Sequence, residues 1–251
     1  MGKLAFHIYL VFSPILFSTL YCQELEETSN RGIEFSGSIN LNTNGISPVP
    51  AFSLDKPSVI GIFSLKRKRF GFTPEMAFST KAKPWFINPR ITYEMIDGEK
   101  FGFSLSALYS FNFTYPEELI GNTLQSTTVV EHYALLQSNS IYSISAKLSI
   151  GLTTFHGLGL QNASIQRGNF FILAANITKL KITENLYHSL FPQLVYVDLD
   201  GDSQGLFVST IYGIGHKKWP FFLSTQLTHA AATNISPNPG FKWNVGLTYH
   251  F

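Results

Sequence analysis

Serine, histidine and acidic residues are the groups of this chain that could support nucleophilic catalysis or metal binding. His188 and Ser189 are neighbours in the run LYHSLF, but adjacent residues of a strand point to opposite faces, so this pair cannot act together. The other histidines are scattered and lack metal-ligand spacing; they include His132, His156, His229 and His250. We therefore predict no catalytic residue, no cofactor site and no metal site, and interpret His156 and His229 as polar groups near loop mouths.

An acidic run resembles the start of a calcium-binding loop. In DLDGDS (198–203), Asp198, Asp200 and Asp202 occupy alternate positions. A calcium loop also needs Gly at its sixth position and Glu at its twelfth, where this chain has Ser203 and Ser209. A hairpin turn at the Asp-Gly pair explains the run better, and weak cation binding at an outer rim is the lesser alternative.

Two basic runs, KRKR (66–69) and GHKK (215–218), could be taken for a nucleic-acid patch. The formal net charge is only +2, whereas a nucleic-acid-binding domain is strongly basic. We expect no nucleic-acid partner and predict that both runs are turns whose cations reach lipid headgroups.

The elements that position these groups are β-strands. The clearest is residues 100–114, KFGFSLSALYSFNFT, where apolar and small polar residues alternate with period two, the pattern of a strand. We expect about twelve strands, near residues 33–43, 57–66, 69–79, 85–96, 100–113, 123–137, 140–155, 169–182, 189–199, 205–214, 219–230 and 240–251. The turn between the sixth and seventh is placed at Ser138 and Asn139.

The composition of the polar faces indicates which face meets water. A water-facing surface is rich in Lys, Glu, Arg and Asp, but only 14% of this chain is charged and 45% is hydrophobic. The polar faces hold mostly Ser, Gly, Asn and Thr, which suit a narrow, partly hydrated lumen. We predict an all-β fold, a single antiparallel up-and-down transmembrane β-barrel of about 12 strands (10–14), in preference to a soluble exported barrel that binds lipid.

Connection lengths support this prediction. Between the expected strands the odd-numbered links are longer than the even-numbered ones, apart from the ninth, DGDSQ. In outer-membrane barrels the periplasmic turns are short and the extracellular loops are long.

Six charged residues fall on the polar faces of their strands and are predicted to line the lumen: Glu34, Glu75, Arg90, Glu94, Lys147 and Lys242. A buried charge must be paired or hydrated. These residues therefore either form salt bridges that close the lumen or line a narrow water path, and both readings stay open here, with the closed arrangement slightly favoured.

Residues 1–22 have the parts of a cleaved signal peptide: a positive start at Lys3, an apolar middle and a small residue, Cys22, before the polar stretch QELEE. An uncleaved anchor helix and a lipid-modified Cys22 are the alternatives. The expected organisation is a signal peptide (1–22), a short periplasmic segment (23–32) and the barrel (33–251), and cleavage removes the only cysteine.

The last strand ends in VGLTYHF, with alternation up to Phe251. This ending, with the signal peptide and the strands, resembles bacterial outer-membrane β-barrel proteins. The stretch FSGSINLNTNGISPVPAFSLDKP (35–57) resembles the opening of uncharacterised outer-membrane proteins of this size. The resemblance implies the outer membrane of a Gram-negative bacterium as location and outer-membrane lipids and the barrel-assembly machinery as partners. It also implies that Tyr249 and Phe251 form the assembly signal. Trp85, Trp219 and Trp243, near strand ends, are expected in an aromatic girdle.

The function that we expect is a narrow pore or a structural membrane protein without evident catalysis. One alternative is an outer-membrane lipid-modifying hydrolase with a site at the extracellular rim, and another is the soluble lipid-binding barrel. The sequence names no solute, and the oligomeric state stays open.

Overall fold

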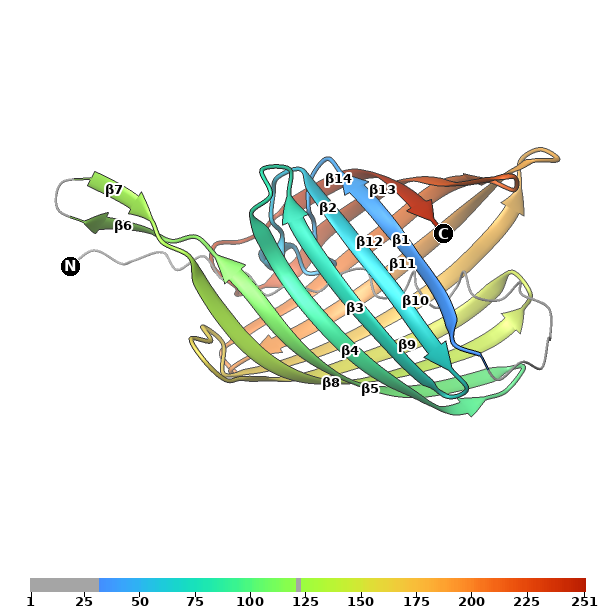
Figure 1. Ribbon diagram of the computed structural model, residues 1–251, viewed down its shortest axis with the longest axis horizontal. Helices are drawn as coiled ribbons and strands as arrows, with labels where there is room; N and C mark the ends of the chain where they lie inside the picture. The colour runs from blue at the N-terminus through green and yellow to red at the C-terminus, as the bar shows by residue number, and fades with distance from the viewer. Residues whose placement is uncertain (1–31, 121–122) are drawn as a thin grey trace.

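The alternating segments form a single closed barrel in the computed structural model, which describes residues 32–120 and 123–251 (Figure 1). Twelve strands pair antiparallel with their neighbours in the chain, and the last pairs with the first. They are β1 (Glu34–Asn42), β2 (Ser58–Arg67), β3 (Phe70–Ser79), β4 (Pro84–Asp97), β5 (Phe101–Thr114), β8 (Val129–Ser145), β9 (Leu148–Gly159), β10 (Arg167–Lys181), β11 (Leu186–Leu199), β12 (Ser203–His216), β13 (Trp219–Thr233) and β14 (Phe241–His250). The predicted all-β, up-and-down barrel is therefore confirmed. The predicted signal peptide lies outside the described residues.

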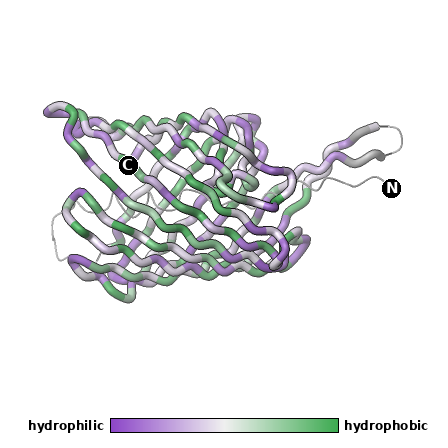
Figure 2. Tube along the Cα trace, turned by 180° about the vertical axis from the view of Figure 1, so that it is seen from behind, coloured by the Kyte–Doolittle hydropathy of each residue, from purple (hydrophilic) through white to green (hydrophobic). Residues whose placement is uncertain are grey.

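The apolar faces of the strands point outward. On β14 the side chains of Phe241, Trp243, Val245, Leu247 and Tyr249 are exposed, whereas the residues between them point into the barrel. Figure 2 shows the same alternation of hydrophobic and hydrophilic residues along the other strands. An apolar surface of this extent is not stable in water, and its outward placement is the reverse of that in a soluble barrel. In the part of the chain that the structure describes, no helix is long and apolar enough to cross a membrane.

The links separate the barrel into two different ends. At one end, here called the turn end, the links 68–69, 98–100, 146–147, 182–185 and 217–218 have two to four residues. At the opposite end, the loop end, the links are 43–57, 80–83, 115–128, 160–166, 200–202 and 234–240. The expected alternation of short and long links is present, with 80–83 and 200–202 as the two short members of the loop end.

The predicted turn at Ser138 and Asn139 is wrong, because β8 continues through both residues to Ser145 and turns at 146–147. Both polar side chains find partners on β9 without leaving the strand. Ser138 Oγ lies 2.8 Å from Thr154 Oγ1, and Asn139 Oδ1 accepts a hydrogen bond of 2.8 Å from Thr153. Cross-strand hydrogen bonds of this kind stabilise a sheet.

The link predicted after β5 contains structure, and the strand predicted for residues 123–137 is wrong in its first part. Two short strands, β6 (Glu117–Ile120) and β7 (Thr123–Ser126), form a separate hairpin, and the barrel strand β8 begins only at Val129. This hairpin projects beyond the loop end of the barrel (Figure 1).

Phe251 completes the barrel wall. Phe251 N–H donates to Gly37 O at 3.1 Å, and Gly37 N–H donates to Phe251 O at 2.9 Å, which extends the pairing of β1 with β14 to the last residue. The Phe251 ring lies 5.9 Å from the ring of Phe35 and 6.0 Å from that of Tyr249. A Cβ on residue 37 would lie 2.6 Å from the Phe251 ring, so only glycine fits opposite it.

Deleting Phe251 should impair closure, because it removes both backbone hydrogen bonds and the aromatic contacts that hold the β1–β14 seam. The folded fraction, measured by heat-modifiable migration in SDS gels, should fall at least severalfold. The folded fraction of F251A should fall less, because this variant keeps the backbone hydrogen bonds. F241A, at the other end of β14, is the control, and an equal loss in F241A would contradict a special role for the terminus.

Candidate functional site

The loop between β1 and β2 folds into the barrel and closes its loop end. Residues 45–50, 52 and 53 are buried, and residues Pro50–Phe52 form a 3₁₀ turn, η2. We call residues 43–57 the plug segment. Val49 is 1% exposed and Phe52 is completely buried, although loops normally run over a protein's surface.

The plug segment packs against the far wall of the lumen. Val49 and Phe52 belong to one apolar cluster with inward-facing side chains of β5, β8, β9, β10, β11 and β12; its wall members include Leu108, Tyr133, Phe155, Phe170, Val197 and Phe207. The Phe52 ring meets the Phe170 ring edge-on at 5.9 Å. Apolar side chains in contact from opposite sides leave this level of the barrel dry.

Polar contacts fix both ends of the plug segment to the wall. At its start, Asn244 Oδ1 accepts hydrogen bonds from Thr43 Oγ1 at 3.3 Å and from Asn44 N–H at 2.9 Å. At its end, Asp55 forms an ion pair with Lys242. Both Asn244 and Lys242 are on β14, so a single strand holds the two ends.

Trp85 lies inside the barrel, so its prediction as a member of the aromatic girdle is wrong. The pairing of β3 with β4 shifts between Ala77 and Phe78, and Trp85 is only 2% exposed, in a cluster with Ile60 and Phe86. The plug segment covers its ring: a Cβ at Gly45 would lie 2.8 Å from it. Trp219 and Trp243, by contrast, are exposed.

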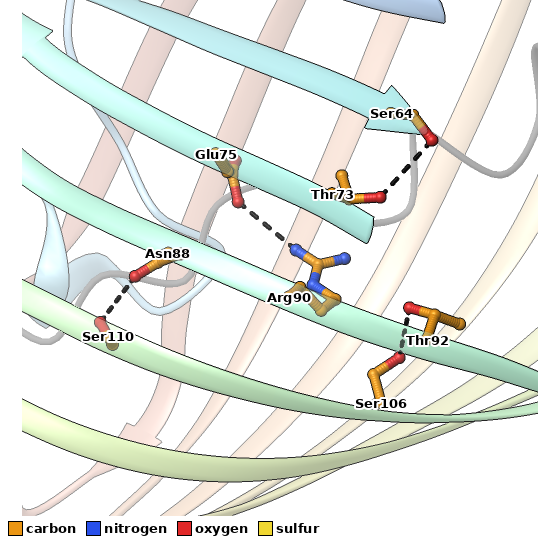
Figure 3. A network of polar contacts seen from close by, with 8 residues as sticks. All are labelled: Ser64, Thr73, Glu75, Asn88, Arg90, Thr92, Ser106 and Ser110. Atoms are coloured by element: carbon orange, nitrogen blue, oxygen red, sulfur yellow. Dashed lines mark hydrogen bonds and ion pairs between the residues drawn. The ribbon is translucent and has the colours of Figure 1, made fainter. Parts of the chain in front are cut away.

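Below the plug, the wall formed by β3, β4 and β5 carries a ladder of polar contacts (Figure 3). Arg90 Nη2 lies 3.5 Å from Glu75 Oε2, and both side chains are buried. Farther along, Ser110 Oγ donates to Asn88 Oδ1 at 2.7 Å, and a hydroxyl pair at 2.8 Å joins β4 to β5. The Glu75–Arg90 pair neutralises the two charges at mid-height.

Several buried polar atoms of the lumen make no hydrogen bond with the described residues. They include Glu75 Oε1, Arg90 Nε, Asn40 Oδ1, Gln137 Oε1, Asn176 Oδ1 and Gln193 Oε1. Buried polar atoms are stable when water or a ligand satisfies them. The middle of the lumen is therefore suited to a small amount of water, in contrast to the apolar level above it.

The remaining predicted lumen charges lie at the two mouths. Glu94 forms a salt bridge of 2.9 Å with Lys66 near the turn end, and Lys242 holds the plug at the loop end. Glu34 is exposed at the first residue of β1. Lys147 lies in the turn between β8 and β9 and not within a strand, because the turn predicted at Ser138 and Asn139 is absent, but its side chain still lines the hollow at the turn end.

A hollow of ≈ 680 Å³ opens at the turn end. Its lining includes the basic residues Lys147, Lys179, Lys181, Lys217 and His250, together with Tyr187 and Trp219. Of the described charges other than the mid-height pair, the turn end carries ten Lys and Arg against five Asp and Glu, and the loop end five against seven. The open mouth is thus the more positive one.

His188 and Ser189 cannot act as a catalytic pair, because Ser189 is buried in the lumen and His188 lies on the other face of β11. Asp200 and Gly201 have positive φ angles of 55° and 81°, and Asp200 Oδ1 accepts the backbone N–H groups of residues 166 and 167; the hairpin-turn interpretation is confirmed. Among residues 32–120 and 123–251, no group of three or more His, Cys, Asp or Glu could hold a metal ion.

With this geometry established, the chain can be compared with known proteins. No protein-family model matches it, and no curated protein sequence matches it. The KdgM porin in complex with disordered oligogalacturonate aligns with a TM-score of 0.53 at 10% identity, covering 86% of this chain and 99% of that one. Another KdgM porin structure gives 0.50 at 10% identity with the same coverage, 86% and 99%.

A third match, the trimer form of in-vitro folded OmpT, an outer membrane protein of Vibrio cholerae, has a TM-score of 0.46 at 7% identity over 88% of this chain and 99% of that one. At these identities the comparison establishes the fold and nothing finer. The resemblance to bacterial outer-membrane β-barrel proteins is confirmed at that level.

Replacing Arg90 alone by Met should destabilise the barrel by about 3–5 kcal/mol, because the buried Glu75 carboxylate loses its cation. The double variant E75L/R90M should lose much less. Urea unfolding in phospholipid vesicles, followed by tryptophan fluorescence, measures both. As a control, K181M breaks the exposed Lys181–Glu184 pair and should cost less than about 1 kcal/mol. If R90M and E75L/R90M lost equal amounts of unfolding free energy, the result would contradict an energetic coupling between Glu75 and Arg90.

Proposed function

We propose that this protein is an outer-membrane β-barrel that forms a narrow pore, closed at rest by the plug segment. The observation that carries the proposal is the complete burial of Phe52 among side chains of the opposite wall. A barrel of twelve strands has a narrow lumen, so one inserted loop is enough to block it.

The membrane location is supported by the outer surface. Exposed apolar side chains occur on every barrel strand, and leucine, phenylalanine and isoleucine dominate them. Trp219 begins β13 at the turn end and Trp243 lies near the loop end of β14, which are the heights where aromatic side chains meet lipid headgroups. The partners that follow are outer-membrane lipids and, for insertion, the barrel-assembly machinery reading Tyr249 and Phe251.

The construction of the plug favours a movable gate over a permanent wall. Fully burying a Val or Phe side chain is worth about 1.5–3 kcal/mol, so Val49 and Phe52 hold the closed state firmly without making it irreversible. The ends of the segment are held by polar contacts, which water can replace. Release of Asp55 from Lys242 is the step that frees the second half of the segment.

The solute that fits the open state is a small anion. The turn-end mouth is lined by lysines, and the mid-height charges cancel within the Glu75–Arg90 pair. The KdgM porin binds an oligogalacturonate, and the fold shared with it is compatible with anion passage here. A structural role without conduction is the second reading, and the closed lumen is its support.

Releasing the plug should raise conductance. In planar bilayers, residues 23–251 of the wild type should be closed most of the time, and D55A/K242A should open at least tenfold more often, with anion selectivity. K56A, which alters an exposed neighbour in the same segment, should behave like the wild type.

If neither the wild type nor D55A/K242A conducted ions, the result would favour the structural role. A wild type that conducts continuously would contradict a closed resting state. Solubility of the folded chain without detergent would contradict the membrane location.

A further inference from the structure

Three polar side chains form a hydrogen-bonded row on the outer surface of the barrel. His156 on β9, Asn169 on β10 and Asp198 on β11 lie directly opposite one another across the sheet. His156 Nδ1 is 2.9 Å from Asn169 Oδ1, and Asn169 Nδ2 donates to Asp198 Oδ2 at 3.4 Å. All three lie near the loop end of their strands.

The row fixes the protonation pattern of the imidazole. Because the Asn169 amide nitrogen donates to Asp198, its oxygen faces His156 and can only accept. His156 must therefore carry its hydrogen on Nδ1. In the neutral imidazole this leaves Nε2 as the nitrogen with a free lone pair, and the ring is held in one orientation by an amide that is itself held by a carboxylate.

A hydroxyl pair lies beside this base. Thr154 is two residues before His156 on the outward face of β9, about 6.6 Å away along the strand. Its Oγ1 is 2.8 Å from Ser138 Oγ on β8. The His156 ring also meets the ring of Phe171 edge-on at 6.2 Å, and Phe171 is the register partner of Thr154. The imidazole and the two hydroxyls thus share one small patch.

The surroundings of the patch are those of a lipid acyl chain. Leu136, which pairs with His156 across β8 and β9, is 65% exposed, and Leu158 is 56% exposed. Placing a polar imidazole among leucines that face lipid costs free energy unless both ring nitrogens have hydrogen-bond partners or the group has a function there. Such a surface favours a membrane lipid as the substrate over a water-soluble molecule.

We propose that His156, Thr154 and Ser138, positioned by Asn169 and Asp198, form a lipid-facing site that hydrolyses ester-linked acyl chains of membrane lipids. This activity is separate from conduction through the lumen. His156 is the general base, Thr154 is the nucleophile and Ser138 is a hydrogen-bond donor beside the reacting carbonyl.

In the first step Thr154 Oγ1 attacks the ester carbonyl carbon and its proton passes to His156 Nε2. The carbonyl π electrons move to oxygen, where the Ser138 hydroxyl can donate to the negative charge. The tetrahedral intermediate collapses and expels the lipid alkoxide, which takes the proton from Nε2. The acyl chain is then bonded to Thr154.

In the second step water attacks the acyl-threonine carbonyl and gives its proton to Nε2. Collapse breaks the bond to Thr154, whose oxygen takes that proton back. The products are a fatty acid and the lipid lacking one acyl chain, and water is the only co-reactant.

Neighbouring histidines provide matched controls. His132 faces outward on β8 near the same end, but its Nδ1 meets the Tyr109 hydroxyl at 3.1 Å in place of an amide backed by a carboxylate. His229 also lies outward near the loop end of β13. Among the residues that the structure describes, neither histidine is joined to a row like that of His156.

The test measures fatty-acid release from phosphatidylethanolamine–phosphatidylglycerol vesicles containing the folded protein. H156Q and T154V should each lower the rate by about 100-fold or more, the range for loss of a general base. H132Q and H229Q should retain it. A long-chain fluorophosphonate should label Thr154 in the wild type, as located by peptide mass spectrometry, and fail to label H156Q.

Asn169 is a positioning residue, so its variants separate orientation from folding. N169A should lower kcat at least tenfold with little change in KM, and N169D, which keeps an acceptor oxygen for Nδ1–H, should recover part of the loss. Wild-type vesicles that release no more fatty acid than protein-free vesicles would overturn the proposal. So would an H156Q or T154V variant of undiminished rate, provided that heat-modifiable migration shows all variants folded.

Discussion

Backbone hydrogen bonding in apolar surroundings is the constraint on which the rest of this structure depends. A strand whose outer face is leucine and phenylalanine cannot leave its N–H and C=O groups unpaired, because lipid offers them no partner. The wall must close, and the last rung is made by the terminal residue, Phe251, against Gly37. Closure then fixes the register of every strand, and with it which side chains face inward.

The narrow lumen follows from closure. Twelve strands enclose little space beyond the side chains themselves, so one loop of modest length is enough to fill the loop end. The plug segment does this with Val49 and Phe52, while the β3–β5 wall below it keeps a polar ladder around Glu75 and Arg90. An apolar level above a polar level is what lets a barrel be closed and still contain a water-compatible interior.

The outer wall faces lipid, which offers no hydrogen-bond partners, so polar side chains on this wall must find partners within the wall itself. Ser138 finds one in Thr154, His132 in Tyr109, and His156 in Asn169. These pairs join register partners on neighbouring strands or residues close to them in the sheet. The row that begins at His156 differs from the others because it extends over a third strand to a carboxylate and orders the imidazole.

The sequence by itself indicated a barrel of about twelve strands, the outward direction of the apolar faces, and the aromatic end of β14, because period-two alternation is a local property of each segment. It misplaced the turn after β8, since the polar run at Ser138 is satisfied only by cross-strand bonds. It also missed the burial of Trp85, which depends on a register shift, and the plug, although the apolar residues within that loop were a readable signal. Only the tertiary structure decided which strands lie opposite at which residue. The relation of His156 to Asn169 and Asp198, and of Phe52 to Phe170, exists through that register alone, because residues far apart in the chain meet only when the barrel has closed.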